Sequence, residues 1–143
     1  MYPEYFIAPM REELSRHGIE ETRTPEDVDR ILAPGSGSVM MVINSVCGCA
    51  AGKARPGIAQ SLQHSVKPDK VATVFAGGDV AATARVREIL SDYPPSSPSV
   101  ALFQDGKPVY YMPRSAIESS DALTISENLK RAYEQYCGSP QDA

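Results

Sequence analysis

The sequence predicts an α/β sandwich in which helices flank a mixed four-stranded sheet. Two apolar runs rich in β-branched residues, residues 38–44 and 70–76, are separated by a segment of helical character. Strands joined through a helix pair in parallel by right-handed crossovers. The first run is nearly all apolar, so we expect a central strand buried on both faces. Residues 99–104 and 107–112 surround Asp105-Gly106, a hairpin signal that adds an antiparallel edge.

Two extra helices are predicted before the sheet. Apolar residues recur at helical spacing through residues 3–17, and Gly18 can end that helix. Thr24 and Pro25 are a strong start for the second helix, because threonine caps a first turn and proline fits the first helical position. The proline- and glycine-rich segment 33–37 ends this helix.

Further helices fill the intervals between and after the strands. The chain from residue 49 to about residue 65 has helical character, and Pro56 must kink it or lie near a turn start. Asp79 can cap a helix over residues 80–90. A last helix with a regular apolar face is predicted over residues 122–136.

The length indicates a single domain. A chain of 143 residues is long enough to bury a core and shows no internal repeat. We divide it into an N-terminal helical extension over residues 1–37, a core over residues 38–137 and a short polar tail over residues 138–143. The apolar fraction of 42% and the charged fraction of 22% are ordinary for a globular protein.

The charge balance and the lengths of the apolar runs argue against several partners. A net charge of −4 gives no long-range attraction for nucleic acid or an anionic membrane. No apolar run approaches the roughly 20 residues that a membrane helix needs. The start of the chain is acidic and lacks the apolar centre of a signal peptide. We therefore expect a cytoplasmic protein with neither a membrane nor a nucleic acid as partner.

The cysteines are the main chemical signal. Cys47 and Cys49 flank one glycine directly after the first strand, and Cys137 stands alone near the end of the chain. Structural disulfides are rare in the reducing cytosol, where a close pair is more often catalytic or metal-binding. The alternative is two small buried apolar side chains without chemical function.

The position of Cys47 favours reactivity. A thiolate at a helix start faces unpaired backbone N–H groups and the positive end of the helix dipole, which lowers its pKa. Lys53 and Arg55 either add positive potential or form a solvated helix face. Gly48 allows a sharp bend between the cysteines. A disulfide across one residue closes a small, strained ring that is easily reduced, so the pair suits a redox switch better than a staple.

The stretch "SSPSVALFQDGK", together with the strand, the Cys-x-Cys and the helix proline, resembles the thioredoxin fold. That resemblance implies a cis peptide bond at Pro98, next to the reactive cysteine. Two departures are plain, because the motif is Cys-Gly-Cys rather than Cys-x-x-Cys and no tryptophan precedes it.

A closer resemblance is to the bacilliredoxin family, small bacterial proteins of the thioredoxin superfamily. It is carried by "VINSVCGCAAGKARPG", "TVFAGGDVAATARVREIL", "PPSSPSVALFQDGKPVYYMPRSAIE" and the late Cys137. The resemblance implies that Cys47 attacks and Cys49 resolves mixed disulfides between protein cysteines and bacillithiol. Gly48, Ser97 and Pro98 would contact the S-thiolated target protein. No cofactor is implied beyond the redox-active cysteine pair and bacillithiol as co-substrate.

Two other functions stay open. The first is a general disulfide isomerase or reductase without a dedicated small thiol. The second is a metal or cluster module using Cys47, Cys49 and Cys137 or a histidine. Structural zinc prefers four ligands, usually in pairs spaced by two or more residues, so the one-residue spacing favours no metal. Cys137 is a possible auxiliary thiol.

Overall fold

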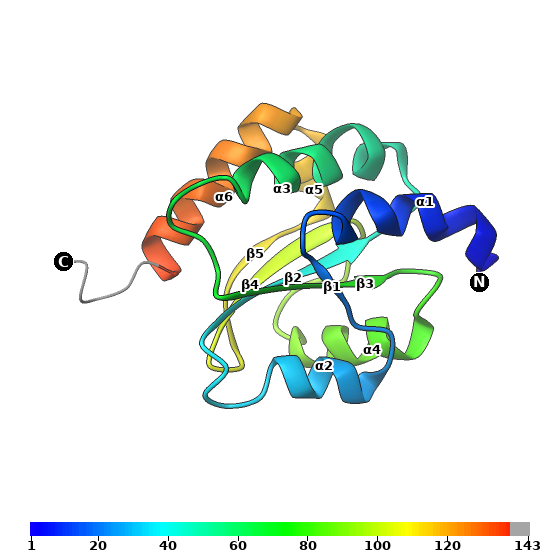
Figure 1. Ribbon diagram of the computed structural model, residues 1–143, viewed down its shortest axis with the longest axis horizontal. Coiled ribbons are helices and arrows are strands. Elements are labelled where there is room, and N and C mark those ends of the chain that lie inside the picture. Colours follow the sequence, from blue (N-terminus) through cyan, green and yellow to red (C-terminus); the bar gives the residue numbers. More distant parts are fainter. Residues whose placement is uncertain (138–143) are drawn as a thin grey trace.

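A computed structural model describes residues 1–137 as three layers, with a sheet between two groups of helices (Figure 1). The predicted tail, residues 138–143, lies outside the described residues. The helices are α1 (Glu4–Ser15), α2 (Pro25–Ile31), η1 (Ala50–Ala54), α3 (Arg55–Ser61), α4 (Val80–Ile89), α5 (Arg114–Glu118) and α6 (Ala122–Tyr136). The strands are β1 (Glu20–Glu21), β2 (Ser38–Asn44), β3 (Lys70–Phe75), β4 (Ser99–Gln104) and β5 (Lys107–Met112). Among the described helices, none has the length and apolar character needed to cross a membrane.

The sheet is mixed, as predicted, but it has five strands in the order β1-β3-β2-β4-β5. Strand β2 pairs in parallel with β3 and antiparallel with β4, and β4 pairs antiparallel with β5. The additional strand is β1, a two-residue edge strand parallel to β3. It consists of two glutamates and is continued by Thr22, whose N–H donates to the Thr73 carbonyl at 2.8 Å. The prediction of four strands was wrong because this strand has no apolar signal.

Strand β2 lies at the centre of the sheet, and all seven of its residues are buried. Its side chains alternate between two apolar clusters. Met40 and Val42 join the cluster under α1, α3 and α6, whereas Met41 and Ile43 join the cluster under α2 and α4. Figure 1 shows the two helical layers on opposite faces of the sheet. The uninterrupted apolar run therefore reflects burial on both faces.

The first 37 residues contribute to every layer. Helix α1 covers one face, α2 packs beside α4 on the other, and β1 forms the sheet edge (Figure 1). Helix α2 begins as expected, because the Thr24 hydroxyl accepts from the Asp27 N–H at 3.1 Å. The N-terminal segment is thus an integral part of the sandwich.

Asp79 does not cap α4 with its side chain, contrary to the prediction. Its carboxylate accepts two hydrogen bonds of 2.8 Å from Arg11 of α1, and one of 3.1 Å from the Phe75 N–H. Asp79 and Arg11 are both buried. A buried guanidinium requires a paired anion, so Asp79 joins α1 to the end of β3 instead of closing a helix turn.

The helical stretch after β2 changes character at Pro56. Residues 50–54 form one turn of π-helix, η1, and the Arg55 N–H donates to the Ala50 carbonyl. Helix α3 then starts at Arg55 with Pro56 in its first turn, where proline needs no donor. A π-turn of this kind is frequent at functional sites.

Candidate active site

Cys47 occupies the cap position of the helical stretch that follows β2. Its N–H donates to the Ser45 hydroxyl at 3.0 Å. Its carbonyl accepts from the Ala50 N–H at 2.9 Å and from the Ala51 N–H at 3.2 Å. The strand end and the helix start therefore fix the backbone of Cys47 from both sides, and its side chain faces the first N–H groups of the helix.

The two thiols of the Cys-Gly-Cys motif are in contact. The Sγ atoms of Cys47 and Cys49 lie 2.7 Å apart, and both residues are half-buried. The hydrogen bond from the Cys49 thiol lowers the pKa of Cys47, and the backbone N–H groups of Cys49 and Ala50 lower this pKa further. Burial raises the pKa of Cys49, and the hydrogen bond to Cys47 and the negative charge there raise it further. The lowered pKa of Cys47 agrees in direction with the prediction from the helix start, although the partner thiol has the larger effect.

A third group of the site is Arg114, at the start of α5, which sequence reasoning missed. Its positive charge lowers the pKa of both Cys47 and Cys49. The backbone N–H of Arg114 donates to the Ser96 hydroxyl at 3.1 Å, and its Nη1 donates to the Ser97 carbonyl at 3.4 Å. The only sequence signal was a basic residue directly after the last strand, in a segment too short to show helical periodicity.

Arg55 is neither a solvated side chain nor a neighbour whose charge shifts the pKa of Cys47. It is 3% exposed, and its Nη1 donates to the Asn44 side-chain oxygen at 3.0 Å and to the Ser45 carbonyl at 2.8 Å. Its Nε donates to Glu13 of α1 at 3.0 Å. Because Ser45 in turn holds the Cys47 N–H, Arg55 braces the turn that carries the nucleophile.

Gly48 adopts the helical backbone and is exposed. Apart from the two neighbouring cysteines and the backbone of its own helix, no atom lies within 4 Å of a Cβ added there, and the residue does not have positive φ. The predicted sharp bend at Gly48 is therefore wrong, and this backbone has room for a Cβ.

The Ser97-Pro98 peptide bond is cis, as the resemblance implied. Pro98 is buried and Ser97 is half-buried directly before β4. The Ser97 carbonyl is within hydrogen-bonding reach of Arg114, whose charge also acts on Cys47. Arg114 thus connects the proline loop with the cysteine pair.

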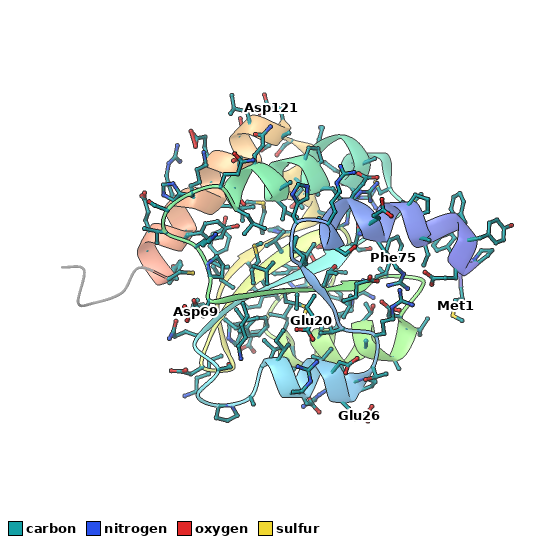
Figure 2. The ribbon with its side chains drawn as sticks, in the orientation of Figure 1. Met1, Glu20, Glu26, Asp69, Phe75 and Asp121 are labelled. Atoms are coloured by element: carbon teal, nitrogen blue, oxygen red, sulfur yellow. The ribbon has the colours of Figure 1, made fainter. Side chains whose placement is uncertain are left out.

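Cys137 is at the other end of the sheet from the cysteine pair. Burial raises its pKa, and its neighbours are Ser38, the first residue of β2, and Asp69, which precedes β3. Figure 2 labels Asp69, which directly precedes β3, and Phe75, its last residue, toward opposite ends of this strand. Since Cys47 follows the other end of β2, the two sites are separated by a strand about 20 Å long.

This separation bears on the metal alternative, because Cys137 cannot complete a ligand set with the pair. Within residues 1–137, no three side chains of histidine, cysteine, aspartate or glutamate gather in a way that could hold a metal ion.

The site thus combines a dithiol that follows the central strand β2 with a cis proline directly before β4, which pairs with that strand. Solved structures share this fold. A thioredoxin from Malassezia sympodialis is similar at a TM-score of 0.60 and 12% identity, covering 84% of this chain and 91% of that one. A mutant thioredoxin from Halobacterium salinarum is similar at a TM-score of 0.59 and 16% identity, with coverage of 84% and 91%. The protein has a thioredoxin fold.

Sequence relatives define the family within that class. A family model described as "Disulphide isomerase" matches residues 2–137. A bacilliredoxin from Koribacter versatilis is 50% identical over 143 residues, covering all of this chain and 99% of the relative. A bacilliredoxin from Halalkalibacterium halodurans is 45% identical over 136 residues, with coverage of 95% and 94%. The chain belongs to the bacilliredoxin family, and its general class is that of a thiol oxidoreductase.

Proposed function

We propose that the protein removes a low-molecular-weight thiol, bacillithiol, from mixed disulfides on protein cysteines, with Cys47 as nucleophile and Cys49 as resolving thiol. The observation that carries this proposal is the asymmetry of the pair. The pKa of Cys47 is lowered and that of Cys49 is raised, although the two sulfurs are in contact. Attack needs a thiolate, and Cys47 is the thiol that ionises first.

The reaction proceeds in two exchanges. The Cys47 thiolate attacks one sulfur of the mixed disulfide, a new S–S bond forms, and the other sulfur leaves as a thiolate. Cys49 then loses its proton and attacks the Cys47 sulfur, which releases the captured thiol. The oxidising equivalents remain in a Cys47–Cys49 disulfide, and a thiol reductant returns two electrons and two protons. This cycle requires a reducing compartment, so the proposed location is the cytoplasm.

Single-cysteine variants test these roles. Cys47→Ser should abolish attack, whereas Cys49→Ser should retain attack and accumulate an adduct on Cys47, because no second thiol resolves it. Mass spectrometry after incubation with a bacillithiolated protein detects the adduct. Cys137→Ser is the control and should keep the wild-type rate, since Cys137 is remote from the pair. An active Cys47→Ser protein with the adduct on Cys49 would reverse the assignment.

A general disulfide isomerase or reductase is the second candidate, favoured by the description of the matching family model. The same dithiol could reduce protein disulfides without selecting a small thiol. Rates measured on bacillithiol, glutathione and protein–protein mixed disulfides of one target cysteine separate the two candidates. Equal rates on all three would favour the general activity.

A further inference from the structure

A cavity of about 530 Å³ lies between the proline loop and the start of α5, and one of its lining residues, Arg114, acts through its charge on the cysteine pair. Its walls include Tyr93, Ser96, Tyr111, Arg114 and Ser115. We call this cavity the aromatic pocket. Its volume is that of a small-molecule site, with a mostly apolar lining and a few polar groups.

Hydrogen bonds hold the walls of the aromatic pocket in place. The rings of Tyr93 and Tyr111 are 5.0 Å apart between centroids. The Tyr111 hydroxyl donates to the Pro94 carbonyl at 3.1 Å and lies 2.9 Å from the Ser96 hydroxyl. Since the Ser96 hydroxyl also accepts from the Arg114 N–H, the loop, β5 and α5 form one connected frame. A preformed frame loses little conformational entropy on binding.

Arg114 connects the aromatic pocket with the reactive sulfurs. It lines the pocket, its Nη1 reaches the Ser97 carbonyl, and its charge acts on both thiols of the pair. Helix α5 also contacts η1, and the Lys53 ammonium donates to the Glu118 carbonyl. Arg114 and Glu118 thus connect the wall of the pocket with the helical turn that follows Cys47.

The Arg114 guanidinium is available to an anion. Its Nε donates to Glu118 at 2.8 Å, but the two side chains are 45% and 52% exposed. An exposed pair four residues apart on a helix contributes little stability, so a ligand carboxylate can displace Glu118 at small cost. The planar guanidinium matches a carboxylate in two-point geometry.

We propose that the aromatic pocket binds the small-thiol half of the mixed disulfide, and that this thiol carries a carboxylate held by Arg114. The inference rests on the proposed function and names the half of the substrate that Cys47 captures. The Cys47 thiolate then attacks the sulfur of the small thiol, a Cys47–small-thiol disulfide forms, and the target protein leaves as a thiolate. Cys49 completes the cycle as described above.

The occupant follows from size and charge. A concave site of this size accepts one small molecule, whereas a target protein would approach along the exposed surface at Gly48. Among the described residues that line the pocket, Arg114 is the only cation and Glu118, its exposed ion-pair partner, is the only anion. A ligand carboxylate that displaces Glu118 would therefore be the group that Arg114 selects. The aromatic walls provide apolar contact for the rest of the molecule.

The experiment uses a peptide with one cysteine, joined as a mixed disulfide either to 3-mercaptopropionate or to 3-mercaptopropionamide. These thiols have nearly the same size and differ in charge. Each second-order rate with the protein is divided by the rate of the same substrate with dithiothreitol, which removes intrinsic differences in reactivity. Wild-type protein should prefer the carboxylate about 10-fold, the scale of one charge-assisted hydrogen bond.

Arg114→Gln should remove this preference, so that the ratio of the two normalised rates falls to about 1, since the charged donor is lost. The variant also raises the pKa of Cys47, but this slows both substrates and cancels in the ratio. Ser115→Trp fills the pocket from an exposed position and keeps Arg114, and it should abolish the preference as well. Arg131→Gln, on the exposed surface of α6, is the matched control and should retain the wild-type ratio.

Each result has a distinct meaning. If wild-type protein reduces neither these substrates nor a bacillithiolated protein tested beside them, the proposed function fails. If it reduces only the bacillithiolated protein, the function stands and the pocket proposal is overturned. If it reduces both at equal normalised rates, the function stands and the pocket proposal is overturned. A preference that survives Arg114→Gln or Ser115→Trp places the carboxylate elsewhere and also overturns it. Both disulfides are also made with a second peptide that has glutamate in place of a neutral residue beside the cysteine. A rate that follows this peptide residue, and not the small thiol, assigns the pocket to the target protein and overturns the proposal too.

Discussion

Replacing Arg55 with methionine should destabilise the fold and loosen the turn that carries Cys47. Methionine keeps the length of the buried side chain but removes three hydrogen bonds, which join Arg55 to Asn44, Ser45 and Glu13. Arg55 is 3% exposed, so water cannot replace the lost donors without opening the core.

The magnitude follows from which acceptors remain unpaired. A buried acceptor that loses its donor costs about 1–3 kcal/mol. The Ser45 carbonyl loses its Arg55 donor, whereas the Asn44 oxygen still accepts from the Ser45 N–H at 2.8 Å. The Glu13 side chain is 37% exposed and regains water, so its loss contributes little. We expect the free energy of unfolding to fall by about 2–3 kcal/mol.

Urea unfolding followed by far-ultraviolet circular dichroism measures this loss, because the chain has no tryptophan for fluorescence. Arg30→Met is the matched control, since Arg30 pairs with Glu20 on an exposed surface and should cost less than about 1 kcal/mol. Alkylation of Cys47 at neutral pH should also slow in Arg55→Met but not in Arg30→Met. Equal unfolding free energies for the two variants would refute the bracing role of Arg55.

Three other changes test the site and its support. Because the pKa of Cys47 is lowered, iodoacetamide should alkylate it faster than a peptide thiol at pH 6–7. Cys49→Ala removes the thiol that lowers this pKa most and should raise the pKa of Cys47. A pH profile of alkylation equal to that of a free thiol would contradict this. Gly48→Ala should raise the free energy of unfolding in urea by about 0.5–1 kcal/mol, since the backbone is helical and unobstructed. If thiol–disulfide exchange is slower in this variant, the added methyl group hinders access to the sulfur atoms. Asp79→Ala removes the buried partner of Arg11 and leaves it only Glu4 and Glu21, which are 53% and 26% exposed, so it should cost about 1.5–3 kcal/mol. Asp29→Ala, which breaks an exposed pair, should cost less than about 1 kcal/mol, and equal losses would argue against the buried pair.

Local signals predicted most of the backbone. The run 38–44 and the hairpin at Asp105-Gly106 lie where the sequence put them, because apolar patterning and positive φ at the turn are properties of adjacent residues. The Thr24 cap is equally local. Strand β1 has no such pattern, since its two glutamates are held by backbone pairing with β3.

Interactions between distant residues were the part that sequence alone could not supply. Asp79 has the residue type and position of a cap, but Arg11, 68 positions away, takes its carboxylate. Arg55 likewise has the composition of an exposed helix position, and only the packing of α1 shows that it is buried. The acidity of Cys47 was predictable from the helix start, whereas the contribution of Arg114 required the position of α5.

The contacts of α1 with the reactive turn define the smallest unit that could be transplanted into another protein. The Asn44 side chain donates to the Met10 carbonyl at 3.2 Å, and Glu13 accepts from Arg55. A chain trimmed to residues 38–137 would resemble a minimal redox module. In that chain, however, Arg55 would lose Glu13 and the Asn44 side chain would lose the Met10 carbonyl as hydrogen-bond acceptors. Fusions and grafts of this dithiol therefore have to include α1, which acts as a template for the nucleophile more than thirty residues before it in the chain.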